Sequence, residues 1–348
     1  MSAHPRQAPQ RRVGGRRNVV TTVARFREAG IVVVLALLVL FVSARNANFL
    51  TISNLNGIAL DIAILVVLAI GETVVILTRN IDLSVGAVLG FSALCVGVVF
   101  KDHPGAPVVV ALGLGALVGL LFGLGNGLLV SLGQVPAIIA TLGTLGIYRG
   151  LVFVYSNEVG HPEVTRSDLP ANILGLATER MLGVPVFFLI PVVLLLVAAY
   201  WLRQTRGGRE IYAVGDNPLA ARLAGIDNAR VVLLAFALSG ALAGLAGVLY
   251  AARYAQVDTL AGNGFELTVI AAVVIGGTST LGGVGGILGT FIGCVLLGVI
   301  NNALILVTDP GTAQFWQRAV YGAVILGAVV ADALISRRLQ RALQRRRA

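Results

Sequence analysis

The feature that most constrains this sequence is a series of ten apolar runs, most of them close to the thickness of a bilayer. A helix that crosses the hydrocarbon core needs about 20 mostly apolar residues. The third and eighth runs are short for a full crossing. The runs lie at 30–43, 58–78, 85–100, 107–132, 135–155, 181–202, 231–250, 267–275, 284–307 and 315–335.

Composition places these runs in lipid. Hydrophobic residues make up 57% of the 348 residues and charged residues only 12%, which is about half of the roughly 25% typical of soluble domains. So few charges could not cover the surface of a soluble fold of this size. The sequence therefore predicts an all-α polytopic membrane protein with about ten transmembrane helices, two of them short or interrupted, and with membrane lipid around it.

Basic residues set the orientation of the predicted spans. With ten crossings, nineteen of the 26 Lys and Arg residues fall on the side that holds both termini, and five fall on the other. The positive-inside rule makes the richer side cytoplasmic, so we expect a multi-pass protein of the bacterial cytoplasmic (inner) membrane. Its expected parts are a basic cytoplasmic tail at 1–28 that precedes a signal anchor, a transmembrane domain at 29–335 with a cytoplasmic loop at 203–230, and a second basic tail at 336–348.

Several classes of protein are excluded by what the sequence lacks. The net charge of +10 sits in the tails and the central loop, where it meets lipid headgroups, so we expect no nucleic-acid partner. The three histidines are far apart and have no metal-ligand spacing, so we expect no metal or cofactor. The single lysine, Lys101, is followed by Asp102, which rules out a GxxxxGK[ST] phosphate loop. The chain is predicted not to be an enzyme, and any ATP site that drives it must lie on another subunit.

Glycine recurs every four residues in two of the runs, as at 115–127 and 285–293. Small residues at this spacing let helix backbones approach closely inside a membrane. Close packing is the simpler interpretation, and a sliding seam used in a conformational change is the alternative.

Two polar interruptions, at 78–86 and 276–283, divide apolar runs. Non-helical backbone at membrane depth needs protein or a water-filled cavity to cover it, and paired interruptions are typical of transport pathways. Short turns at the membrane surface explain them equally well. Polar side chains in and near the runs are candidates to line a pathway, with a helix-to-helix hydrogen bond as the alternative for each. These candidates are Asn80, Asp82, Ser84, Asn126, Thr141, Thr144, Glu266, Thr278, Ser279, Asn301 and Asn302.

The loop at 203–230 contains the complete signal for one short helix. Asn217 suits the N-cap, Pro218 the first helical position and Gly225 a left-handed C-terminal cap. Leu219 and Leu223 then share one face. A helix of about two turns is marginal alone, so we expect it to dock on a partner protein, with the lipid surface as the alternative.

Four stretches then carry a family resemblance: TRNIDLSVGA (78–87), PAIIATLGTLGIYRG (136–150), YAVGDNPLAARLAGI (212–226) and GGTSTLGGVGGILGT (276–290). Together they resemble the ribose/xylose-type permease subunits of bacterial ABC importers, and the form LTRNIDLSVG is similar to rhamnose and autoinducer-2 permeases. The likeness runs from about residue 30 to 335.

This resemblance implies a permease subunit that forms the translocation pathway for a monosaccharide or sugar-like solute. The implied partners are cytoplasmic ATP-binding subunits, an extracytoplasmic sugar-binding protein and a second permease copy or paralogue. A branched-chain amino-acid ABC permease and a partner-independent secondary transporter are the alternatives. The resemblance also makes the short helix the element that couples to the ATPase subunit. Its expected coupling residues are Asp216, Asn217, Pro218, Leu219, Ala220, Arg222, Leu223 and Gly225.

Overall fold

The computed structural model describes residues 14–160, 163–181, 184–308, 312, 315–324, 326–327 and 330. Seven helices in this part of the chain are long and apolar enough to cross a membrane. They are α2 (Ile52–Leu77), α3 (Val85–Asp102), α4 (Val108–Ser131), α5 (Ala137–Glu158), α7 (Val186–Gln204), α10 (Asn228–Tyr254) and α12 (Ile287–Val307). The prediction of a helical, polytopic membrane protein is confirmed.

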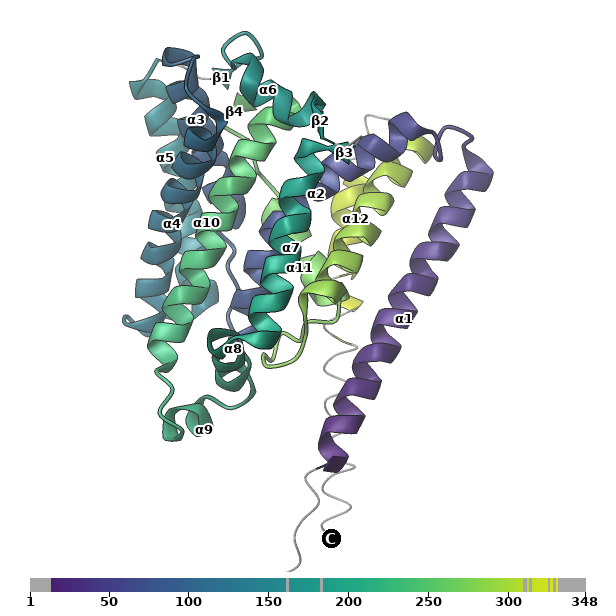
Figure 1. Ribbon diagram of the computed structural model, residues 1–348, viewed down its shortest axis with the longest axis vertical. Helices are drawn as coiled ribbons and strands as arrows, with labels where there is room; N and C mark the ends of the chain where they lie inside the picture. The colour runs from purple at the N-terminus through teal and green to yellow at the C-terminus, as the bar shows by residue number, and fades with distance from the viewer. Residues whose placement is uncertain are drawn as a thin grey trace, which may run out of the picture.

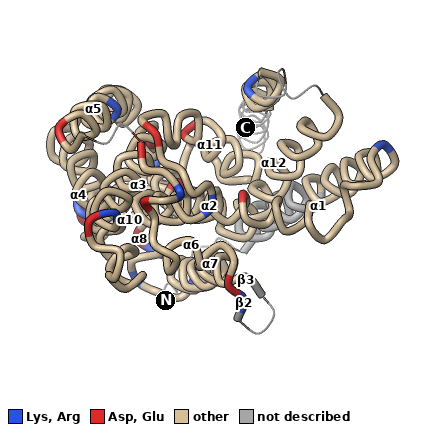
Figure 2. Tube along the Cα trace, turned by 90° about the horizontal axis from the view of Figure 1, so that it is seen from above, with Lys and Arg blue, Asp and Glu red and all other residues tan. Residues whose placement is uncertain are grey.

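Two further apolar helices are shorter. Helix α1 (Gly14–Arg45) has an apolar part at Gly30–Arg45 and lies at the edge of the bundle beside α12 (Figures 1 and 2). Helix α11 (Phe265–Ile275) has eleven residues and corresponds to the short eighth run. The predicted tenth span and the tail at 1–28 lie partly outside the described residues, and the tail at 336–348 lies wholly outside them.

Short elements gather at the two ends of the bundle (Figure 1). One end, called the α9 end below, carries α8 (Arg206–Asp216) and α9 (Pro218–Leu223). The opposite end carries α6 (Ala171–Thr178) and four two-residue strands, which the sequence analysis did not predict. Strand β1 (Glu163–Val164) pairs antiparallel with β4 (Val257–Asp258), and β2 (Arg180–Met181) pairs with β3 (Val184–Pro185). The β1–β4 pair ties together loops that are almost a hundred residues apart.

Helix α2 forms the centre of the bundle (Figure 2). Every residue from Ile62 to Leu77 is buried, and α7, α10, α11 and α12 pack around it. Helices that are apolar on all sides are typical of such central positions. A movement of α2 would therefore displace the helices that pack around it.

The glycine spacing of α4 produces a close contact with α10. A Cβ atom at Gly119 would collide with the carbonyl oxygen of Gly240, and one at Gly244 would collide with that of Gly115. In lipid, apolar side chains gain nothing by leaving one apolar surface for another, so such backbone contact supplies the packing energy. The close-packing interpretation of the glycine repeat is confirmed.

The α4–α10 contact makes a prediction about stability. Gly119→Ala should force the two helices apart at a cost of about 1–3 kcal/mol, the usual range for overpacking. Gly113→Ala on the same helix is the matched control, because nothing lies within 4 Å of a Cβ atom at that position. We expect the melting temperature of the detergent-purified protein to fall for Gly119→Ala only. Equal melting temperatures for the two variants would contradict the proposed packing.

Candidate functional site

Helix α9 has the capped geometry that its sequence predicts. The side chain of Asn217 accepts a hydrogen bond from the Ala220 N–H at 3.0 Å, and Pro218 occupies the first turn. Gly225 has a φ of +82°, the left-handed conformation that glycine adopts without strain. The N–H groups of Gly225 and Ile226 donate back to the carbonyls of Arg222 and Ala221, which completes a Schellman motif.

One face of α9 points out of the protein. The exposed fractions of Leu219 and Leu223 are 69% and 82%, whereas that of Ala221, on the inner face, is 4%. The side chain of Asn228, at the start of α10, donates to the carbonyl of Pro218 at 2.8 Å and holds α9 in place. The helix therefore presents two large apolar side chains at the surface of the protein from a fixed base.

The end of α8 that leads into α9 is clasped by the two predicted interruptions. Arg79, just after α2, donates from Nε to the Gly215 carbonyl and from Nη2 to the Asp216 carbonyl, each at 2.6 Å. The Gly283 N–H, in the turn before α12, donates to the Leu77 carbonyl at 3.0 Å. The Tyr212 hydroxyl on α8 donates to the Gly285 carbonyl at 3.0 Å. We call this set of contacts the α8 junction.

Glycine is required for the close approach of these backbones. A Cβ atom at Gly215 would collide with the Leu77 carbonyl oxygen, and one at Gly283 would lie 2.6 Å from the Asp216 nitrogen. Gly282 and Gly283 also have φ values of +79° and +70°, which a residue with a Cβ atom rarely adopts. The α8 junction thus links the base of α9 to α2 and α12 through close backbone contacts that leave little room for independent movement.

From the α8 junction, residues 80–84 continue into the bundle as non-helical chain and meet a buried polar cluster. The Asp82 carboxylate accepts from the N–H and the hydroxyl of Ser84, at 2.9 and 2.7 Å. Asn126 Nδ2 donates to Ser84 Oγ at 2.7 Å, and Tyr148 donates to Asn126 Oδ1 at 3.1 Å. Glu72 Oε1 accepts from the Asp82 N–H at 3.1 Å. Glu72 and Asp82 thus accept hydrogen bonds from backbone N–H groups of the non-helical segment, in place of water.

The cluster contains three of the predicted pathway residues, and two others lie beside it. Asp82, Ser84 and Asn126 are each 1% exposed or less. The hydroxyl of Thr141 donates to the Ile81 carbonyl at 3.2 Å, and that of Thr144 donates to the Thr141 carbonyl at 3.3 Å. In this conformation all five side chains form hydrogen bonds with other groups of the protein.

A second break lies before α11, at 255–264, where the sequence analysis expected none. The turn after α11 is at the α8 junction, and eleven helical residues span only about 16 Å of a core that is about 30 Å thick. Helix α11 therefore begins inside the bundle. Gly262 and Gly264 have φ values of +74° and +86°. The break packs against the start of α3, because a Cβ atom at Gly86 would collide with the Glu266 carboxylate and the Gly262 carbonyl.

A polar cavity of about 520 Å³ lies beside this break, between α2, α11, α12 and the helical residues 315–324. This is within the range of about 300–1,000 Å³ that is usual for small-molecule sites. Glu266 and Asn301, two of the predicted pathway residues, line it. Other polar lining residues are Asp61, Asn263, Thr268, Gln317 and Arg318. The arrangement can exchange hydrogen bonds with a polar solute at membrane depth.

The remaining predicted pathway residues lie elsewhere. Asn80 donates to the carbonyl and the hydroxyl of Thr78, both at 3.0 Å. Thr278 and Ser279 are buried in the turn that forms the α8 junction. Asn302 exchanges two side-chain amide hydrogen bonds with Asn54, at 2.8 and 3.0 Å. For Asn302 the structure thus supplies the helix-to-helix hydrogen bond that was the alternative.

Comparison with known proteins now adds to this geometry. Residues 54–329 match a family model described as "Branched-chain amino acid transport system / permease component". The chain belongs to this family. It is 40% identical over 323 residues to the ribose import permease protein RbsC of Escherichia coli (strain K12), which covers 92% of this chain and 97% of the relative. It is 36% identical over 321 residues to the autoinducer 2 import system permease protein LsrC of Salmonella typhi, which covers 92% and 90%. No solved structure matches the chain.

Family membership decides several of the sequence-based predictions. The resemblance to ribose-type and autoinducer-2 permeases is confirmed, and the chain is a permease subunit rather than an ATPase or another enzyme. The seven apolar helices agree with a multi-pass permease of the bacterial inner membrane. The roles of individual residues are a separate question, which the geometry above addresses.

Sequence reasoning missed part of this permease's site. Arg149 donates from Nη1 to the Ala261 carbonyl at 2.6 Å and holds the second break. The sequence analysis did not connect this arginine, or Glu72, with a break in the backbone. The available signal for the second break was the pair of glycines, at 262 and 264, that flank Asn263.

The α8 junction predicts that Gly215 is needed to hold α9. Gly215→Ala should push α8 away from Leu77 and raise amide hydrogen exchange across 206–226, at a cost of about 1–3 kcal/mol. Gly207→Ala on the same helix is the control, since its Cβ atom would lie 3.4 Å from the Trp201 ring, an ordinary contact. Exchange measured by mass spectrometry should rise for Gly215→Ala alone. If both variants exchange like the wild type, α8 is not clasped as described.

Proposed function

We propose that this permease forms the translocation pathway of an ATP-binding-cassette importer for a monosaccharide or sugar-like solute. The observation that carries the proposal is the exposed leucine pair of α9, which follows directly on α8, the helix that is clasped to α2 and the turn before α12. Exposed apolar side chains on a helix that is held in this way are suited to docking on a partner that moves the helix. The ribose and autoinducer 2 import functions named for its relatives support a sugar-like solute.

In this proposal α9 docks on a cytoplasmic ATP-binding subunit. The exposed Leu219 and Leu223 enter an apolar groove of that subunit, and Asp216, Ala220 and Arg222 lie around them. Asn217, Pro218 and Gly225 keep the helix formed. When the ATPase subunits close, α9 moves, and the α8 junction carries the movement to α2 and α12. This places the α9 end and both termini on the cytoplasmic side of about ten spans.

The proposed assembly has two further components. A second permease copy or a paralogue would complete the pathway, and an extracytoplasmic sugar-binding protein would deliver solute at the end that carries α6. Lipid covers the exposed apolar faces of the remaining helices. The basic side predicted from the loops agrees with this orientation, since the loop that holds α8 and α9 is the richest in arginine.

The polar cavity beside the second break is the proposed site of solute passage. Its amide, carboxylate and hydroxyl groups can replace water around a sugar at little net cost, because each hydrogen bond to water is exchanged for one to protein. Glu266 sits in the first turn of α11, and α11 leads directly to the turn at the α8 junction. A movement that begins at α9 would thus reach the cavity through one short helix.

A branched-chain amino acid is the second candidate solute, because the description of the matching family model names this class. The cavity contains Asp61, Glu266 and Arg318, which could pair with an amino group and a carboxylate. Uptake of radiolabelled ribose, autoinducer 2 and leucine by vesicles that contain the assembled importer separates the two. Leucine uptake alone would replace the sugar proposal.

The docking proposal predicts that Leu219→Asp with Leu223→Asp abolishes uptake. Two carboxylates cannot enter an apolar groove without a large desolvation cost, so the ATPase subunits should hydrolyse ATP without moving solute. The protein itself should stay folded, since both side chains are exposed. The control is Leu219→Met with Leu223→Met, which keeps apolar side chains of similar volume and should retain uptake. Normal uptake by the aspartate variant would refute the docking role of α9.

The two adjacent amides of α12 give a second functional prediction. Asn301→Ala removes a lining group of the cavity and should lower the rate of uptake about fivefold, for a lost hydrogen bond of about 1 kcal/mol, with the melting temperature unchanged. Asn302→Ala removes the amide pair with Asn54 and should lower the melting temperature instead. Measuring both properties for both variants tests the assignment. A stability loss at Asn301 with normal uptake would exclude it from the pathway.

A further inference from the structure

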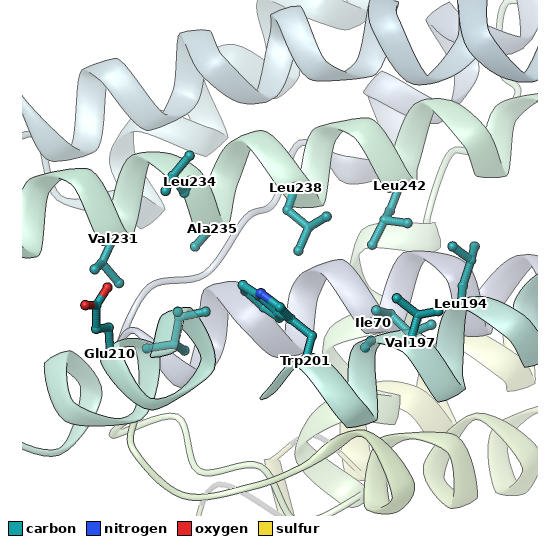
Figure 3. Close-up of a pocket in the computed structure, with 13 residues that line it drawn as sticks. Ile70, Leu194, Val197, Trp201, Glu210, Val231, Leu234, Ala235, Leu238 and Leu242 are labelled. Atoms are coloured by element: carbon teal, nitrogen blue, oxygen red, sulfur yellow. The ribbon is translucent and has the colours of Figure 1, made fainter. Parts of the chain in front are cut away.

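An apolar groove of about 410 Å³ lies between α7 and α10 near the α9 end. Leu194, Val197 and Trp201 form one wall, and Leu234, Leu238 and Leu242 form the other (Figure 3). Ile70 of α2 contributes to the lining, and Ile211 of α8 also contacts the groove. The groove opens toward lipid, because Val197 and Leu234 are more than half exposed.

The groove exists because its two walls diverge. Helices α7 and α10 both pack on α2, but they have almost no direct contact with each other. An empty slot between two spans forfeits the dispersion contacts of all the side chains that line it. Within a bilayer, the material that can fill an apolar slot open to lipid is an acyl chain.

The charges at the α8 end of the groove favour a particular headgroup. Arg203 near the end of α7, and Arg206 and Arg209 in the first turns of α8, are exposed. Glu210, which lines the groove, is paired with Arg206 at 2.8 Å. The side chain of Arg206 is nonetheless 85% exposed. A net positive charge at this depth attracts anionic lipid, and Trp201 is of the type that sits at the headgroup level.

We propose that this groove binds one acyl chain of an anionic phospholipid, whose phosphate lies against the arginines of α8. The chain fills the space between α7 and α10, and the headgroup holds α8 from the side opposite the α8 junction. Bound lipid would then brace the base of α9 during coupling. That consequence rests on the proposed function, whereas binding itself does not.

The two tryptophans of the chain provide the test. Trp316→Phe leaves Trp201, in the groove, as the only reporter, and Trp201→Phe leaves Trp316, which is 57% exposed outside it. Each variant is reconstituted in phosphatidylcholine vesicles with increasing phosphatidylglycerol that carries bromine on its acyl chains. Trp201 fluorescence should be quenched to saturation at a low mole fraction. Trp316 should be quenched in proportion to the fraction, as both reporters should be by brominated phosphatidylcholine.

Two variants, each made in the Trp316→Phe background, test the headgroup contact and the acyl-chain groove separately. Arg206→Gln with Arg209→Gln should weaken the apparent phosphatidylglycerol affinity at least about fivefold, and both positions are exposed, so folding is not at risk. Leu238→Phe narrows the groove and should remove the saturable quenching. The proposal is overturned if Trp201 is quenched in proportion to the fraction of either lipid, or if saturable quenching survives in both variants. Uptake is not measured, so this result is independent of the transport proposal.

Discussion

The hydrocarbon core of a bilayer contains no water that could hydrogen-bond backbone N–H and C=O groups outside the helices. This constraint organises the interior of the permease. The chain leaves helical geometry at 80–84 inside the bundle, and at 255–264 on the way from the end that carries β4 to the start of α11. Each unpaired backbone group there would cost several kcal/mol in hydrocarbon. Glu72 and Asp82 therefore accept N–H groups of the first break, and Arg149 donates to a carbonyl of the second. These three polar side chains thus serve the fold, and the cavity beside the second break is where solute passage is proposed.

In the proposed function, the two breaks connect coupling with solute passage. Helix α11 starts at the cavity and ends at the turn that is held by the α8 junction. Because α11 is short and rigid, its two ends cannot move independently. Helix α2 contributes a second connection, since Leu77 contacts the junction while Asp61 lines the cavity. Two packed helices thus connect the α8 junction with the cavity that is the proposed solute site.

How far the sequence could predict this arrangement depended on how local each signal is. The spans and the caps of α9 were predictable because hydropathy and capping depend on neighbouring residues alone. Helix α8 was not predicted, because its three glycines disfavour a helix by propensity, while contacts with Leu77 and Arg79 stabilise it. Asn301 and Asn302 could not be distinguished either. Adjacent residues on a helix differ by about 100° in direction, and only packing decides which one faces α2 and which faces the cavity.

Arg79 shows why one residue type is needed at the α8 junction. Its φ of +69° is unfavourable for a residue with a side chain, at about 1–2 kcal/mol. The guanidinium offsets this cost by donating to two consecutive carbonyls, and a charged hydrogen bond contributes about 1.5–3 kcal/mol. These carbonyls belong to the last two residues of α8, where the helix dipole is negative and favours a cation. A lysine presents a single point of charge rather than a planar fork, so it could not hold both carbonyls with the same geometry. The rigid base of α9 therefore depends on the shape of the arginine side chain as well as on its charge.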